Sequence, residues 1–149
     1  MEQQRVAIIL ERTASTTIED WYQHVLLDPA LTAASMTRAD RCAHLPQLFR
    51  DLIFRLQSIT IPGTKELFSE AAAQHGISRR KQGYTAAMMV EESRILQVSI
   101  FRSLHENIGY IDFQLLLPDV MTIANEVDAQ LSRAVACFVE ESAREDSAA

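Results

Sequence analysis

The chain has 149 residues, 48% of them hydrophobic, which is enough for one domain with a buried core and no stabilising disulfide. Its formal net charge of -6 argues against nucleic acid and an anionic membrane as main partners, because both require concentrated positive charge. Four Gly, four Pro and few aromatic residues favour helix over strand, so the sequence predicts a single all-α domain over residues 1–149.

The first predicted helix covers residues 6–27. Its apolar residues recur at spacings of three and four, as on one face of a helix: Leu10, Ala14, Ile18, Trp21 and Val25. Ser and Thr side chains in residues 13–17 compete for backbone hydrogen bonds, so the alternative is a break with Thr16 or Thr17 capping a second helix. We expect one continuous helix.

Asp28-Pro29 ends the first helix, and a second predicted helix follows. Thr37, with Asp40 three residues later, resembles an N-terminal capping box. The apolar stripe of this helix consists of Cys42, Leu45, Phe49, Leu52 and Leu56. Proline is tolerated only in a first turn or at a kink, so Pro46 predicts a short turn before it and a continuous helix to about residue 58.

The next segment is typical of a linker, since it contains Ile-Pro-Gly at residues 61–63. Thr64 is the expected N-cap of a third helix that reaches Gln82. Gly83 suits a C-terminal cap with positive φ, and Thr85 caps a fourth helix to about residue 108. That helix is apolar on more than one side, which predicts a central position in which its polar residues need partners.

A long last helix is predicted from residue 113 to about 143, with a kink at Pro118 and a frayed tail from about residue 144. Its apolar stripe follows coiled-coil spacing: Leu116, Val120, Ile123, Val127, Leu131, Ala134 and Phe138. Such a stripe forms a homodimer seam or a signalling helix, and the same spacing also packs inside a monomeric bundle. Together the elements predict one bundle of five or six helices, with a globin-like arrangement as one option.

One group of polar residues lies on either side of a single turn. His75, Arg79 and Gln82 share a face of the third helix, and the turn at Tyr84 makes the third and fourth helices antiparallel neighbours, which brings Glu92 near Arg79. The first interpretation is an Arg79–Glu92 ion pair that only fastens the two helices. The second is a ligand-binding or switchable network, in which His75 changes charge near neutral pH.

Other chemistry has little support in the sequence. The four histidines, His24, His44, His75 and His105, show no i,i+4 pair, so no metal or cofactor is predicted. A haem- or small-ligand-binding sensor that uses one histidine is an alternative, and histidine phosphotransfer at His105-Glu106-Asn107 is another. The chain has no activated nucleophile, phosphate loop or G-x-S-x-G motif, so we expect it not to be an enzyme.

The sequence also predicts the cellular compartment. It shows no signal peptide and no transmembrane segment, which predicts a protein without membrane contact. Cys42 and Cys137 lie far apart and have no C-x-x-C spacing. We therefore expect a cytoplasmic protein with free thiols.

Residues 75–96 carry the most specific pattern, a His, an Arg four residues on, a Gly-aromatic turn and Glu-x-x-x-Leu. Its members are His75, Arg79, Gly83, Tyr84, Glu92 and Leu96. With Trp21 and Leu45-Pro46, this pattern resembles the N-terminal regulatory domain of RsbR/RsbRD-type stressosome co-antagonists, which also precedes some bacterial sensor histidine kinases. The resemblance implies a non-enzymatic bacterial signal-transduction domain that forms a homodimer. It further implies a signal passed through the last helix to an output domain, either a kinase or an anti-sigma antagonist.

Overall fold

The structure is a computed structural model that describes residues 2–58 and 69–148. The helices in these residues are α1 (Val6–Leu26), α2 (Pro29–Thr32), α3 (Arg38–Cys42), α4 (Leu45–Gln57), α5 (Glu70–Lys81), α6 (Ala86–Glu106), the 3-10 helix η1 (Ile108–Tyr110) and α7 (Phe113–Ala148). The described residues contain no β-strand, only an isolated bridge between Gln4 and Ile111. The predicted all-α bundle with a long C-terminal helix is confirmed, and α2 and α3 add two short helices to it.

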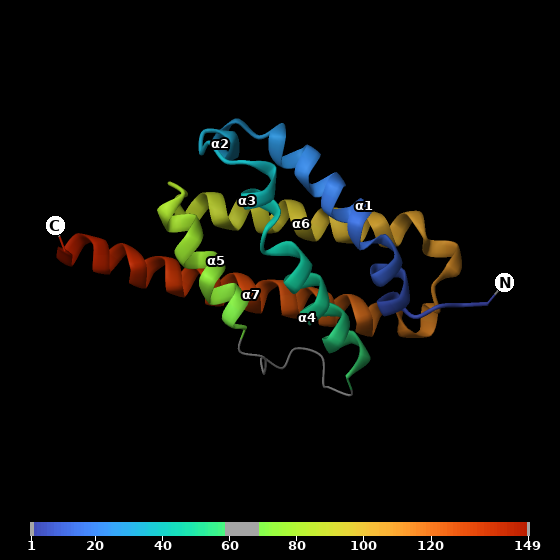
Figure 1. Ribbon diagram of the computed structural model, residues 1–149. Coiled ribbons are helices and arrows are strands. Elements are labelled where there is room, and N and C mark those ends of the chain that lie inside the picture. Colours follow the sequence, from blue (N-terminus) through green and yellow to red (C-terminus); the bar gives the residue numbers. More distant parts are fainter. Residues whose placement is uncertain (1, 59–68, 149) are drawn as a thin grey trace.

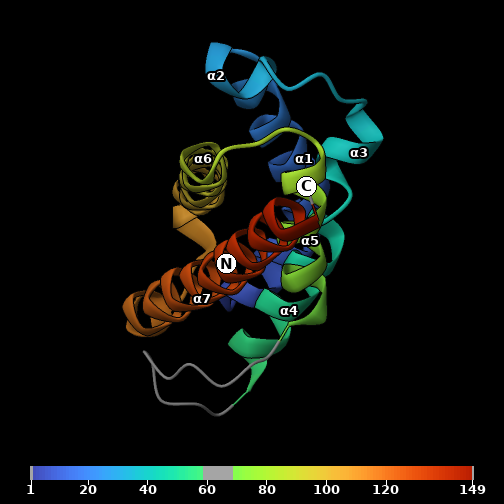
Figure 2. The same ribbon diagram turned by 90° about the vertical axis from the view of Figure 1, so that its left-hand side faces the viewer.

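Between them, α6 and α7 contact α1, α2, α4 and α5. Helices α1 and α6 lie side by side, and α7 runs along the length of the molecule and contacts α4, α5 and α6 (Figure 1). Helix α5 lies beside α7 in both ribbon views (Figure 2). The C-terminal end of α7 extends past the other helices (Figure 1).

The hydrophobic core lies between α1, α4, α6 and α7. Trp21, Leu52, Ile100 and Ile123, one from each of these helices, are all fully buried. Helix α6 packs against α1 and α7 and also contacts α2. It therefore has the central position that its apolar surface on more than one side predicted.

Helix α1 is continuous, as expected, in spite of its central Ser and Thr residues. The Thr13 hydroxyl donates a hydrogen bond to the Ile9 carbonyl and accepts one from the Ser103 hydroxyl, at 2.8 and 3.0 Å. The Thr16 hydroxyl donates to the Thr13 carbonyl. These hydroxyl groups bond within the helix or to α6, so they do not break it.

Capping residues set several of the helix boundaries. The Asp28 carboxylate accepts hydrogen bonds from backbone N–H groups at the start of α2, and the Thr37 hydroxyl accepts one from the Asp40 N–H at the start of α3. Pro46 lies in the first turn of α4, which follows a short turn and ends at Gln57. Both the Thr37 cap and the position of Pro46 agree with the sequence prediction.

The third predicted helix begins later in the described residues than the sequence suggested. Ser69 has extended backbone angles and its hydroxyl accepts a hydrogen bond from the Ala72 N–H, so α5 begins at Glu70. The predicted cap at Thr64 and the linker at residues 61–63 lie outside the described residues. Gly83 has φ +87°, so the positive φ predicted for the end of α5 is confirmed.

Two later boundaries also differ from the prediction. The Thr85 hydroxyl caps α6 as expected, but α6 ends at Glu106 because the next residues form η1. Helix α7 runs to Ala148 rather than to about residue 143, and an ion pair between Arg80 of α5 and Glu145 stabilises the extra turn. Pro118 lies inside α7, where a kink remains a prediction.

Candidate functional site

Glu92 is the centre of a buried polar network between α4, α5 and α6. Only 2% of this residue is exposed. Its Oε1 atom accepts a hydrogen bond from Arg79 Nε at 2.9 Å and lies 3.0 Å from His75 Nε2. Its backbone carbonyl accepts a hydrogen bond from Trp21 Nε1 at 3.0 Å. One carboxylate therefore connects α5 and α6, and the α6 backbone at the same residue is bonded to α1.

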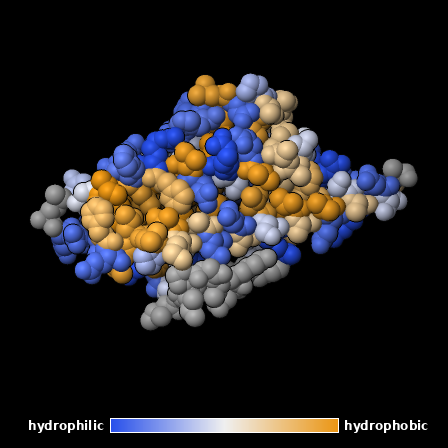
Figure 3. All heavy atoms as spheres, turned by 180° about the vertical axis from the view of Figure 1, so that it is seen from behind, coloured by the Kyte–Doolittle hydropathy of each residue, from blue (hydrophilic) through white to orange (hydrophobic). Residues whose placement is uncertain are grey.

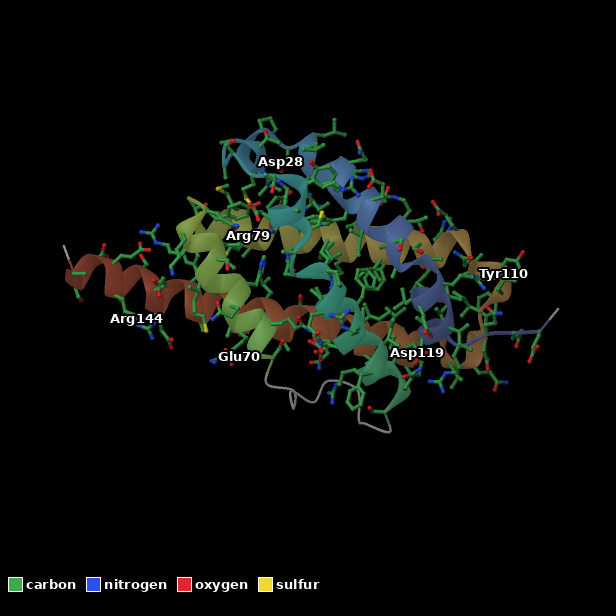
Figure 4. All side chains as sticks on the ribbon, in the orientation of Figure 1. Asp28, Glu70, Arg79, Tyr110, Asp119 and Arg144 are labelled. Carbon is green, nitrogen blue, oxygen red and sulfur yellow. The ribbon has the colours of Figure 1, made fainter. Side chains whose placement is uncertain are left out.

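Arg79 is the best-connected side chain of the network. It is 1% exposed, and Figure 4 shows it on α5 where that helix passes α3 and α6. Besides its bond to Glu92, it donates to Gln82 Oε1 at 2.8 Å and to the Arg41 carbonyl at 2.7 Å. Its guanidinium carbon lies 4.9 Å from the centre of the Tyr84 ring. The five residues predicted as a network, His75, Arg79, Gln82, Tyr84 and Glu92, thus lie together.

The structure places three further residues beside the network, and the sequence predicted none of them there. The His44 ring is stacked on the His75 ring, with centroids 3.7 Å apart and planes at 15°, and its other neighbour is Trp21, edge-on at 5.8 Å. Arg41 donates hydrogen bonds to the Tyr84 hydroxyl at 2.8 Å and to two backbone carbonyls near α2. These residues come from distant parts of the chain, and no spacing rule links them to residues 75–92.

The buried surroundings set the protonation states of the network. Burial lowers the pKa of His44 well below 6.5, and the nearby His75 ring and Arg79 charge lower it further. Burial also lowers the pKa of His75, against the opposing effect of Glu92. Burial alone would raise the pKa of Glu92, but the His75 hydrogen bond and the Arg79 charge lower it overall. Near neutral pH both imidazoles are therefore uncharged and the carboxylate is ionised.

Tyr84 is fixed as a hydrogen-bonding phenol rather than as an acid. Burial raises its pKa, and the nearby Glu92 carboxylate adds to the increase. Only 1% of the residue is exposed. Its hydroxyl therefore stays protonated and accepts the hydrogen bond from Arg41.

Two hollows meet at the stacked histidine rings. An inner cavity of about 30 Å³ is lined by both histidines, Glu92 and apolar residues of α4, α6 and α7. An outer groove of about 330 Å³ is lined by the same two histidines and by polar residues of α3, α4 and α5, among them Gln74 and Ser78. His44 and His75 therefore border both the groove and the inner cavity.

Among the residues that the structure describes, two polar atoms beside these hollows are buried and have no hydrogen-bond partner. They are Glu92 Oε2 and His44 Nδ1. The side chains of His44, His75 and Glu92 each offer one metal-ligating atom, and these three atoms lie within 4.8 Å of one another. Buried polar atoms usually have partners, so the unpaired oxygen of Glu92 indicates a site that water or another ligand completes.

The apolar stripe predicted on the last helix lies inside the chain. Ile123, Val127 and Phe138 are buried, while Leu116, Val120 and Leu131 are partly buried and pack against the same core. Val127 and Leu131 also line the inner cavity beside Glu92. The stripe therefore packs within the bundle, and the predicted homodimer would need another surface.

A different set of apolar side chains is exposed where α7 begins. Phe113, Leu117 and Met121, one turn apart on α7, are 62%, 67% and 49% exposed. Ile108 and Tyr110 of η1 are also exposed. Apolar side chains gather at this end of the molecule, on the left of Figure 3.

Comparisons with known proteins identify no relative. No family model, no curated protein and no solved structure matches the chain. In the part of the chain that the structure describes, every helix is too short or too polar to cross a membrane.

Proposed function

We propose that the chain is a non-enzymatic bacterial signal-transduction domain, as the sequence pattern of residues 75–96 implies. The network around Glu92 holds α5 against α4 and α6, and α5 in turn contacts the C-terminal half of α7. A change in the network releases or shifts α5, and α7 passes this change to an output domain. The output domain is a kinase or an anti-sigma antagonist, and the domain works as a homodimer in the cytoplasm.

The observation that carries this proposal is the way α5 is attached. Apart from Ile77, which is partly exposed, α5 has no apolar side chain larger than Ala in its sequence EAAAQHGISRRK. Its buried residues are Ala72, Ala73, Gly76 and Arg79. Few apolar side chains of α5 are therefore available for burial, and the hydrogen bonds of His75 and Arg79 to Glu92 add to its backbone contact with α7.

Helix α5 is in close contact with the C-terminal half of α7. A methyl group placed on Gly76 would overlap the carbonyl oxygen of Ala134, so the two helix backbones nearly touch. Arg80 Nε forms an ion pair with Glu145 Oε2 at 3.0 Å, and the Arg80 guanidinium carbon lies 5.7 Å from the centre of the Phe138 ring. A movement of α5 must therefore move or free residues 134–145 of α7.

The other functions considered have less support from the site. The inner cavity of about 30 Å³ is far smaller than the roughly 300–1,000 Å³ of typical ligand pockets, so haem does not fit it. His105 follows Glu92 by 13 residues on the same helix, or about 20 Å at 1.5 Å per residue, and is exposed. Phosphotransfer at His105 would thus leave the network without a role.

Hydrogen exchange of the Glu92→Gln variant tests the proposal. The substitution keeps the size of the side chain but removes the charge that Arg79 and His75 share. We expect faster amide exchange in α5 and in residues 134–145 of α7, with α1 and the rest of α6 unchanged. Mass spectrometry after proteolysis measures these segments separately.

Glu91→Gln is the matched control, because Glu91 is the preceding residue and its ion pair is with the exposed Arg94. This variant should exchange like the parent protein. If Glu92→Gln changes exchange equally in all helices, or only in α5, the proposed relay to α7 is wrong.

A further inference from the structure

We propose that His44, His75 and Glu92 bind a divalent transition metal ion of the Zn²⁺ type. This inference deepens the proposed function by naming an input for the network. Whether the ion binds is measured directly, so it is decided separately from whether α7 responds.

The three side chains form a ligand set that such ions prefer. Two imidazole nitrogens and one carboxylate oxygen, with a further position open to water, are typical of zinc and of other first-row metals. One potential ligand atom from each residue lies within 4.8 Å of the others. The inner cavity, which all three residues line, has room for about two water molecules as additional ligands.

An ion would also satisfy a buried atom of the site. In the described residues, Glu92 Oε2 is buried without a hydrogen-bond partner, and Glu92 lines the inner cavity. Buried polar atoms usually have partners. An ion bound in this cavity would supply one.

An ion can reach these residues from the surface. The outer groove of about 330 Å³ contains His44 and His75 in its wall, together with Asp40 and the amide side chains of Gln47 and Gln74. The oxygen atoms of these side chains can coordinate a cation transiently while it loses its hydration water. The two histidines, together with Ala71, line both the groove and the inner cavity.

Binding requires a local rearrangement, which makes the site responsive. Imidazole lone pairs lie in the ring plane, so the two stacked rings must turn toward a common point. His75 must give up its hydrogen bond to Glu92 Oε1, and its proton moves to the other ring nitrogen. Arg79 stays close and repels a cation, so we expect weaker affinity than that of structural zinc sites.

The rearrangement acts on three elements at once. His44 directly precedes α4, His75 belongs to α5 and Glu92 to α6. A bound ion would replace one hydrogen bond between α5 and α6 with coordinate bonds to all three elements. It would thus fix α5 and slow its amide exchange.

Calorimetric titration of the chelator-treated protein with Zn²⁺ tests the site. We expect one ion per chain, and visible absorption bands of low-symmetry Co²⁺ when Co²⁺ replaces Zn²⁺. His44→Gln, His75→Gln and Glu92→Gln should each weaken binding about 100-fold or more, since loss of a ligand costs at least as much as loss of an outer partner. His24→Gln and Glu91→Gln, which alter a neighbouring helix and a neighbouring acid, should bind like the parent.

Nitrogen NMR of the unaltered protein covers the case that a variant fails to fold. Zn²⁺ should shift the ring nitrogen resonances of His44 and His75 and leave those of His24 and His105 unchanged. Absence of binding to the parent, or equal binding by His24→Gln and the site variants, overturns the proposal. Zn²⁺ binding without a change of exchange in α7 would support the metal site and contradict the relay.

Discussion

At the scale of single residues, the two carboxylate oxygens of Glu92 have different surroundings. Oε1 is shared by Arg79 and His75, whereas Oε2 is buried and has no hydrogen-bond partner within residues 2–58 and 69–148. The spacing of residues 75–92 was enough to predict that Arg79 and Glu92 meet, because two helices joined by a tight turn face each other. It could not predict His44, because that contact depends on how α4 packs against α5.

The charge of Glu92 should matter far more to stability than that of its neighbour. Glu92→Gln leaves the buried Arg79 without a counterion, which costs about 3 kcal/mol. Glu91→Gln removes a solvent-facing pair with Arg94 and should cost less than about 1 kcal/mol. Urea denaturation followed by circular dichroism gives both free energies of unfolding. Equal losses in the two variants would show that Arg79 does not need Glu92.

The buried histidines should make the protein less stable in mild acid. Their pKa values are lower in the folded chain than the usual 6.5, so below that pH the unfolded chain binds more protons and the free energy of unfolding falls. Each histidine that stays uncharged contributes up to about 1.4 kcal/mol per pH unit. Urea denaturation at pH values from about 7.5 to about 5, with a chelator present, measures this fall in the free energy of unfolding.

His44→Gln is the variant that tests this pH dependence. The slope of stability against pH should be smaller in His44→Gln than in the parent protein, because one buried imidazole is removed. A parent protein whose stability does not change over this range would contradict the assignment of uncharged, buried rings.

At the scale of elements, α5 differs from the other long helices because small and polar residues attach it. Its position in the sequence followed from the Gly83 cap and the Thr85 cap of the next helix. The close crossing of α5 with α7 could not be predicted from the sequence, because Ala and Gly do not form an apolar stripe that indicates a partner helix. Only the folded chain shows that Gly76 lies against Ala134.

Gly76→Ala should separate α5 from α7. The added methyl group would overlap backbone rather than a flexible side chain, so the helices must move apart, at a cost of about 2 kcal/mol or more. Thermal denaturation of this variant measures the loss. Gly109→Ala is the control, since a methyl group there has no atom within 4 Å, and it should melt like the parent. Equal melting of the two variants would contradict the close crossing.

At the scale of the whole molecule, periodicity and capping residues predicted most of the fold. The all-α class, the continuous α1 and the long last helix followed from local patterns that tertiary packing did not override. The role of the stripe on α7 could not be decided in this way, because internal packing and a dimer seam require the same spacing. The structure places that stripe in the core and leaves Phe113, Leu117 and Met121 exposed.

The central claim is that α5 is a separately releasable element held by the Glu92 network. Native-state hydrogen exchange of the unaltered protein, at increasing low concentrations of denaturant, tests it most directly. The account predicts that α5 amides exchange through an opening of lower free energy than the global unfolding that exposes the buried amides of α1 and α6. If α5 amides exchange with the same free energy as those of α1 and α6, α5 does not open alone and the claim is wrong.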